Sequence, residues 1–394
     1  MKIISINAGS SSLKFSLFNM DDESVIASGL FERIGIEGSC YTIKYQGEKI
    51  EQEVELVGHG DAVRILLEKL IDLNIIQSLN EIDGVGHRLV HGKDKYSSSV
   101  IITDEVIEDL EKFKDFAPLH NPANVLGIKA FREVLPEVMM VGVFDTAFHQ
   151  TMKEESFLYP VPYGWYRDHG VRKYGFHGTS HRYIADTTAQ VLGKSEFRLI
   201  SCHIGNGGSI SAIRDGKCVD TSMGLTPLAG IMMGTRSGDI DPSIITYVME
   251  KEGKNASEVV DDLNKRSGLL GMSEYSHDMR DIIAKADEGD EKCALARDKY
   301  VRSIVNYIGQ YYLQLGGVDV IVFTAGVGEN SCPIRKLVCE KLLPLGVKID
   351  LEKNNIRGEA VKISTNDSKV EVWVIPTDEE LMIARDTVSI ITNR

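Results

Sequence analysis

IISINAGSSSLKFSLF at residues 3–18 and LISCHIGNGGSISAI at residues 199–213 decide the fold. Each stretch reads as an apolar strand, a turn of small residues and a second, alternating strand. A strand–turn–strand unit near the start of each half of the chain predicts a duplication, with two mixed α/β domains and a cleft between them. The alternative is that two short hairpins resemble one another by chance.

Working outward from these stretches, the pattern is mixed α/β. Apolar runs at residues 138–144, 198–203 and 318–324 predict strands buried on both faces. Helical spacing predicts helices at 181–192, 243–250, 257–265, 291–315 and the chain end, and one that Thr103 caps. Asp215-Gly216 predicts a hairpin between strands 209–214 and 217–220. We place the domain boundary near residues 146–160, where Pro160 and Pro162 interrupt the pattern.

The composition excludes several classes of protein. The 394 residues carry a formal net charge of −14, which argues against nucleic acid or an anionic membrane as a partner. Six scattered cysteines without a CxxC pair are typical of a reduced, cytoplasmic protein. The first residues lack the apolar core of a signal peptide, and no stretch approaches the length that spans a bilayer.

Three small-residue loops follow predicted strands, at residues 7–12, 203–209 and 325–330. Backbone N–H groups in such loops can bind phosphate, and strand ends are where α/β proteins place ligands. Taken alone, the first loop is more simply explained as an ordinary turn with exposed serines, but three such loops in one chain favour phosphate binding. None fits the Walker A or the GxGxxG pattern, which disfavours P-loop and Rossmann architectures.

Cationic and acid/base candidates stand in similar surroundings. Arg88 and Arg236 lie in glycine-containing segments, where a guanidinium can bind a carboxylate or phosphate with two hydrogen bonds. HxxxH occurs at His87/His91 and at His177/His181, but without HExxH we prefer histidines that contact an anion or pack in the core over zinc ligands. Asp145 ends a buried strand and is either a structural carboxylate or part of a magnesium or acid/base site.

Together these segments resemble the acetokinase family. The resemblance covers essentially the whole chain through NAGSSSLK, GHRLVHG, APLHNP, VFDTAFH, FHGTSH, CHIGNGGS, MGTRSGDIDP, AGVGEN and IPTDEE, in the family's order. It implies the acetate and sugar kinase/Hsp70/actin superfamily fold, with two duplicated actin/hexokinase-like (ribonuclease H-like) α/β domains around a nucleotide cleft. The expected domains are residues 1–148, joined by a C-terminal helix at about 378–394, and a nucleotide-binding domain at 149–377.

The resemblance also implies an activity, which is reversible phosphoryl transfer from ATP to acetate, giving acetyl phosphate and ADP. It implies Mg²⁺ (or Mn²⁺) as cofactor and a cytoplasmic homodimer. By position, Asn7 and Glu379 match the metal site, Arg88 the substrate-binding arginine, and Asp145, His177 and Arg236 the catalytic residues. The methyl-pocket positions are Val90, Leu119, Phe176 and Pro227. The ATP-binding positions are Lys14, His203, Ile204, Gly205, Asn206, Gly207, Asp278, Met279, Arg280, Gly326, Val327, Gly328, Glu329 and Asn330.

Three other functions remain as alternatives. A kinase for propionate or another short-chain carboxylate would need the same residues. A sugar kinase of the same superfamily would need Asp145 as a base and a polar pocket, whereas the matched pocket is apolar. An actin- or Hsp70-like ATPase would need a partner-binding module, for which the chain after its last helix leaves no room. Because acetate is already ionised, we expect Asp145 to orient Arg88 or the magnesium shell and not to act as a base.

Overall fold

The computed structural model describes residues 1–118 and 120–393. By their internal contacts they form two compact units, of which the first is residues 1–148 with the chain from 378 onward and the second is residues 149–377. Among the described residues, no helix has both the length and the apolar composition that crossing a membrane requires.

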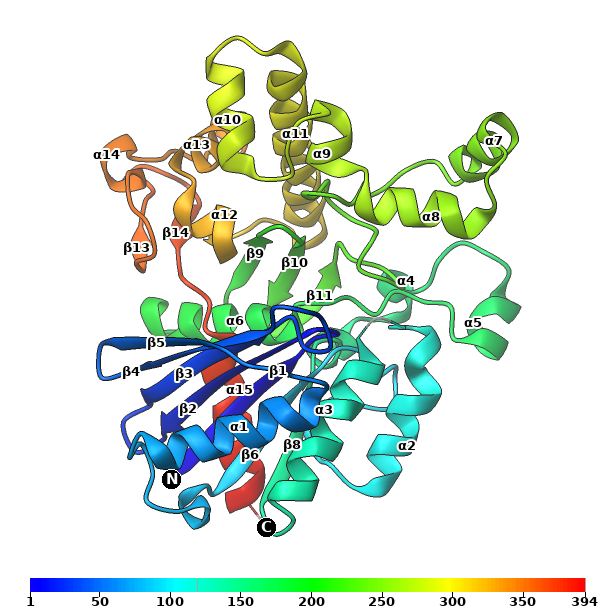
Figure 1. Cartoon of the computed structure of the whole chain (residues 1–394). Helices are drawn as coiled ribbons and strands as arrows, with labels where there is room; N and C mark the ends of the chain where they lie inside the picture. The colour runs from blue at the N-terminus through cyan, green and yellow to red at the C-terminus, as the bar shows by residue number, and fades with distance from the viewer. Residues whose placement is uncertain (119, 394) are drawn as a thin grey trace. The chain divides into compact units, whose positions relative to one another are not determined.

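An eight-stranded sheet forms the centre of the first unit, as far as the described residues show (Figure 1). Its strand order is β5-β4-β3-β2-β1-β6-β8-β7, in which β1 to β5 pair antiparallel while β6 and β8 run parallel to β1. The strands are β1 (Lys2–Ala8), β2 (Ser12–Asn19), β3 (Ser24–Glu32), β4 (Cys40–Tyr45), β5 (Glu48–Glu53), β6 (Gly84–Leu89), β7 (Val100–Ile101) and β8 (Met139–Phe144).

Helices cover both faces of this sheet. On one face pack α1 (His59–Asp72) and α3 (Asn121–Val134), with α2 (Asp104–Lys112) beside α3; on the other packs α15 (Glu379–Thr392), drawn in red in Figure 1. Glycine makes the approach of α15 possible, because a Cβ at Gly84 or Gly86 would collide with side chains of that helix. The end of the chain therefore completes the core of the unit in which the chain began.

A six-stranded sheet forms the centre of the second unit, among the residues that are described. Its order is β11-β10-β9-β12-β14-β13, with strands β9 (Arg198–Ile204), β10 (Gly208–Arg214), β11 (Lys217–Thr221), β12 (Val320–Thr324), β13 (Val361–Lys362) and β14 (Glu371–Val374). The helices are α4 (Glu154–Phe157), α5 (Tyr163–His169), α6 (Gly178–Leu192), α7 (Ser243–Glu252), α8 (Ala256–Lys265), α9 (Gly268–Ser273), α10 (Met279–Asp287), α11 (Glu291–Gln314), α12 (Ala325–Asn330), α13 (Cys332–Lys341) and α14 (Leu351–Asn354).

The two sheets share one topology. In each, a three-stranded antiparallel meander (β1-β2-β3 or β9-β10-β11) continues into two strands parallel to its first strand (β6 and β8, or β12 and β14). The predicted duplicated α/β fold is confirmed, because chance resemblance of two hairpins would not reproduce the order and direction of five strands.

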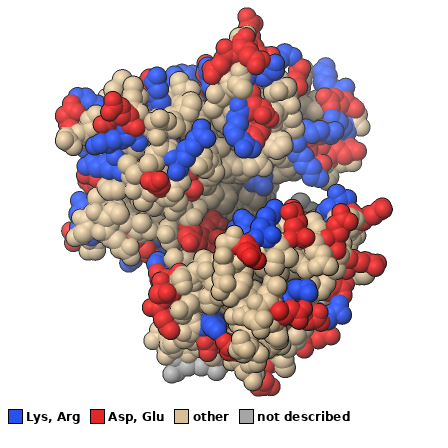
Figure 2. All heavy atoms as spheres, turned by 60° about the vertical axis from the view of Figure 1, so that its left-hand side comes forward, with Lys and Arg blue, Asp and Glu red and all other residues tan. Residues whose placement is uncertain are grey.

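Most predicted elements form where the sequence places them, and Thr103 caps α2 by accepting a hydrogen bond from the backbone N–H of Val106. Two local predictions were wrong. Residues 325–330, predicted as a glycine loop, form the short helix α12, and α6 begins at Gly178 and not at residue 181. Acidic and basic side chains are interspersed on the face in Figure 2, so the negative net charge is not gathered into one patch there.

Candidate active site

Arg88 lies at the centre of a polar cluster in the first unit. Its Nε and Nη2 atoms donate to the two carboxylate oxygens of Asp145 at 3.1 and 2.6 Å, and Nη1 donates to Oδ1 of Asn7 at 3.1 Å. The Asp145 side chain is 3% exposed and that of Arg88 is 22% exposed. Of the five N–H groups of a guanidinium, two therefore have no partner among the described residues and can bind a ligand.

The sheet explains why these three side chains meet. Asn7, Arg88 and Asp145 come from the carboxyl ends of the neighbouring parallel strands β1, β6 and β8, which is where parallel sheets bind ligands. The backbone N–H of Asp145 donates to the carbonyl of Leu89 at 2.8 Å, which fixes the carboxylate beside the end of β6.

The first turn of α15 adds acidic groups to this cluster. Burial raises the pKa of Glu379 to about 7; Arg88 opposes this change and Asp145 adds to it. Burial by itself would lower the pKa of Arg88, but the carboxylates of Asp145 and Glu379 raise it above its ordinary value. Lys14, predicted as a nucleotide contact, forms an ion pair with Glu380 here.

Val90, a predicted methyl-pocket residue, is buried directly after β6. Its backbone N–H donates to Oδ1 of Asn124 at 3.2 Å, and Nδ2 of the same amide donates to the carbonyl of Ala8 at 3.0 Å. The buried Asn124, which the motifs did not single out, thus ties together the strand ends that carry Asn7 and Arg88. Leu119 lies outside the described residues.

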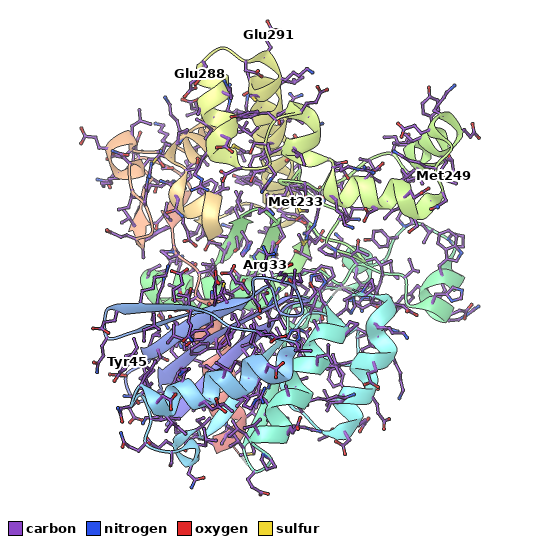
Figure 3. The ribbon with its side chains drawn as sticks, viewed as in Figure 1. Arg33, Tyr45, Met233, Met249, Glu288 and Glu291 are labelled. Carbon is purple, nitrogen blue, oxygen red and sulfur yellow. The ribbon has the colours of Figure 1, made fainter. Side chains whose placement is uncertain are left out.

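In the second unit, His177 and Arg236 approach one glycine turn. A Cβ at Gly207 would lie 3.2 Å from Nη1 of Arg236 and 3.8 Å from Nε2 of His177. Arg236 donates to the carbonyl of Pro227 at 3.3 Å and contacts the sulfur of Met233, which is labelled in Figure 3. Burial lowers the pKa of Arg236, and it has no carboxylate partner among the described residues.

A cavity of about 850 Å³ lies within the second unit, large enough for a nucleotide. Of the residues predicted to bind ATP, it is lined by Gly205, Asn206, Asp278, Met279, Arg280, Gly326, Val327 and Asn330. The sequence interpretation missed the other lining residues, which are Leu269, His277, Ile283, Tyr300, Ser331, Pro333 and Arg357. The lining combines apolar side chains, such as Leu269 and Ile283, with polar and charged ones, such as Asn206 and Arg280, which suits a base and a sugar with phosphates.

Not every predicted ATP-binding residue lines that cavity; those that do not are Lys14, His203, Ile204, Gly207, Gly328 and Glu329. Glu329 acts within the fold: its Oε1 accepts from the backbone N–H groups of Ala325 at 2.7 Å and Thr377 at 3.0 Å. The hydrogen bonds of Arg280 lower the pKa of Asp278 to about 2, and Asp278 in turn caps α10.

The fully buried Arg335 supports α12 from its C-terminal end. Its Nη1 donates to the carbonyls of Gly328 and Glu329 at 2.9 and 2.8 Å, and Nε donates to Oδ1 of Asn354 at 2.8 Å. A cation at the C-terminal end of a helix is favourable. These contacts explain why a glycine-rich segment is helical here. They also hold the residues of α12 that line the cavity in fixed positions.

Comparisons with known proteins agree over nearly the whole chain. Residues 2–385 match the Acetokinase family. The acetate kinase of Bacillus cytotoxicus is 56% identical over 389 residues, covering 98% of each chain. Among solved structures, Porphyromonas gingivalis acetate kinase has a TM-score of 0.95 at 47% identity, covering 99% of each chain. A propionate kinase from Francisella tularensis has a TM-score of 0.93 at 40% identity, covering 98% of this chain and 99% of that one.

Proposed function

We propose how the site residues described above take part in phosphoryl transfer from ATP to acetate. The premise is that the chain belongs to the acetokinase family and is a phosphotransferase with a carboxylate acceptor. The observation that carries this proposal is the guanidinium of Arg88. It is oriented by Asp145 and Asn7 and has two N–H groups left, which matches a carboxylate ligand.

In the reaction, an acetate oxygen attacks the γ-phosphorus of ATP. The new bond joins that oxygen to phosphorus, and the bond to the oxygen bridging the β- and γ-phosphates breaks, so that ADP leaves. Acetate is an anion at neutral pH and has no proton to lose, so no general base is needed. Asp145 therefore orients Arg88, and the buried Val90 contributes to the pocket for the methyl group.

The nucleotide occupies the cavity of the second unit, with its phosphates toward Gly205 and Asn206. Arg236 and His177 act on the transferred phosphoryl group, whose three equatorial oxygens carry the charge in the transition state. The absence of a carboxylate beside Arg236 in the described part of the chain supports this role, because its charge stays available to an anion.

Magnesium fits Asn7 and Glu379. Mg²⁺ is commonly held by one or two protein oxygens together with substrate phosphates and water, so a large ligand cluster is not required. The carboxylate of Glu379 accepts no hydrogen bond from the described residues, and a divalent cation would favour its ionised form. When bound, the cation would neutralise phosphate charge. Glu379→Gln should raise the Mg²⁺ concentration needed for half-maximal rate, and Mn²⁺ should substitute for Mg²⁺.

A cytoplasmic homodimer completes the proposal. The chain carries six free cysteines, which a reducing compartment preserves. Large apolar side chains are exposed on the second unit, among them Trp165 on α5 at 50% and Tyr247 on α7 at 63%. These surfaces suit contact with a second copy, and light scattering would give the mass.

An acyl hydroxamate assay tests the function directly. With ATP, Mg²⁺ and hydroxylamine, acetate should give acetyl hydroxamate in proportion to enzyme. Propionate is the main competitor, given the similarity to the Francisella tularensis propionate kinase, and should react less well, while butyrate should react poorly. ATP hydrolysis without any carboxylate, or phosphorylation of a sugar, would contradict the assignment.

A further inference from the structure

Behind His177 runs a chain of buried hydrogen bonds. Nδ1 of His177 lies 2.9 Å from Oγ of Ser209, and the same oxygen lies 2.8 Å from Nε2 of His181. Nδ1 of His181 then lies 2.9 Å from Oγ of Ser201. His181, Ser201 and Ser209 are all 0% exposed, so solvent does not reach them.

The secondary structure brings this chain together. His177 caps α6 in the left-handed region (φ 57°), and His181 follows four residues later on the same face of the helix. Ser201 on β9 and Ser209 on β10 point toward α6, whereas Ile200 and Ile210 pack in the core with α11. A polar strand face is thereby buried beneath the proposed catalytic histidine.

Proton positions along this chain depend on one another. Burial, followed by the neighbouring His149 and His203, holds the pKa of His181 well below its usual value, so its neutral ring carries one proton. Ser209 also has one proton to donate. If His181 donates from Nε2 to Ser209, the hydroxyl of Ser209 donates to Nδ1 of His177, and the neutral His177 must carry its proton on Nε2.

A proton on Nε2 of His177 would allow this atom to donate a hydrogen bond to the transferred phosphoryl group. Nε2 is the atom of His177 nearest the Gly207 turn, where Nη1 of Arg236 also lies. Phosphoryl oxygens only accept hydrogen bonds, so Nε2 must carry a proton to contribute. With the opposite tautomer, a neutral His177 would present a lone pair at Nε2 and could not donate a hydrogen bond there.

We propose that Ser209 and His181 are positioning residues that hold His177 as the tautomer protonated on Nε2. The functional part of this proposal rests on the proposed phosphoryl transfer, while the tautomer itself is a property of the resting protein. Neither Ser209 nor His181 touches the substrate; each acts through the ring of His177.

Nuclear magnetic resonance of the full chain with ¹⁵N-labelled histidine tests the tautomer without substrate. The His177 signals are identified by their loss in His177→Gln. We expect a protonated Nε2 and an unprotonated Nδ1 in the wild type, and both tautomers in Ser209→Ala. A wild-type His177 protonated on Nδ1 would overturn the proposal, whether or not the enzyme phosphorylates acetate.

Kinetics test the consequence. Ser209→Ala should lower kcat about tenfold or more while the KM for ATP changes less than about twofold. Ser209→Thr keeps the hydroxyl and should recover most of the rate. Ser211→Ala is the matched control, because Ser211 is equally buried on β10 but bonds to Thr221 at 2.8 Å, and it should leave kcat unchanged. Equal kcat in Ser209→Ala and Ser211→Ala would overturn the proposal.

Discussion

Replacing Asp145 by asparagine removes one charge of the pair with Arg88 and leaves the size of the side chain unchanged. Two unit charges about 4 Å apart attract by about 4 kcal/mol at an effective dielectric constant of about 20. Little water screens this pair, since Asp145 is 3% and Arg88 22% exposed. Glu379 would take over part of the interaction with Arg88, so we expect the free energy of unfolding of the first unit to fall by about 2–4 kcal/mol.

Activity should fall further than stability explains. Asparagine offers Arg88 one acceptor oxygen in place of two, and its NH2 group cannot accept, so Arg88 loses one of its three hydrogen bonds and with it the two-point contact that fixes its orientation toward the substrate. We expect kcat/KM for acetate to fall by about 10²–10³, which corresponds to about 3–4 kcal/mol of transition-state stabilisation. Calorimetry should show unchanged ADP affinity, because the nucleotide cavity is lined by residues of the second unit alone.

Asp109→Asn is the matched control in the same unit. Asp109 is 8% exposed, forms an ion pair with Lys95, and accepts a hydrogen bond from the hydroxyl of Tyr96 at 2.6 Å. Its replacement should reduce stability by a similar amount but leave kcat/KM unchanged at a temperature where the protein stays folded. Equal losses of activity in the two variants, or normal kcat/KM in Asp145→Asn, would refute the orienting role.

Three further variants test other parts of the molecule. Arg236→Ala should lower kcat by about 10³ or more while ADP affinity changes less than about threefold, since the guanidinium acts mainly in the transition state; a near-normal kcat would remove Arg236 from the catalytic set. Val90→Ala should raise the ratio of kcat/KM for propionate to that for acetate, by up to about tenfold, because one methylene in an apolar pocket is worth about 1–3 kcal/mol; an unchanged ratio would exclude Val90 from the methyl pocket. Burial lowers the pKa of His149 from 6.5 to about 4, so between these values the unfolded chain binds a proton that the folded unit does not. Stability should therefore rise with pH across this window, by up to about 3 kcal/mol, and urea unfolding of His149→Gln should show a shallower rise.

The sequence predicted the sheets well because their strands carry strong local signals. The apolar run at β8 and the Asp215-Gly216 turn between β10 and β11 both appear where expected. The helix α12 could not be predicted in this way. Its glycines favour a loop locally. The helix depends on the Glu329 carboxylate, which accepts from the N–H of Ala325, and on Arg335, which donates to the carbonyls of Gly328 and Glu329, and these contacts exist only after folding.

The same distinction applies to the candidate site. Asn7 and Arg88 lie near the ends of their strands and Asp145 directly follows one, all in unusual motifs, so the sequence singles them out. Tyr300 lies on the apolar face of α11 and reads as an ordinary core residue, yet it also lines the cavity. No periodicity separates a side chain that packs only against the core from one that packs against both the core and a ligand.

In the proposed mechanism, two arginines in a chain with a net charge of −14 bind two anions in different ways. Arg88 is paired with Asp145, so little of its positive charge is left uncompensated. Such a site suits a singly charged carboxylate, for which orientation by hydrogen bonds matters more than electrostatic attraction. Arg236 is without a carboxylate among the described residues, so its full charge is available to a phosphoryl group whose negative charge is larger and shifts during transfer. A carboxylate introduced beside Arg236 should therefore lower kcat, because it would neutralise the positive charge that acts on the phosphoryl group. At Arg88 the same kind of pairing, with Asp145, is an advantage because it orients the guanidinium.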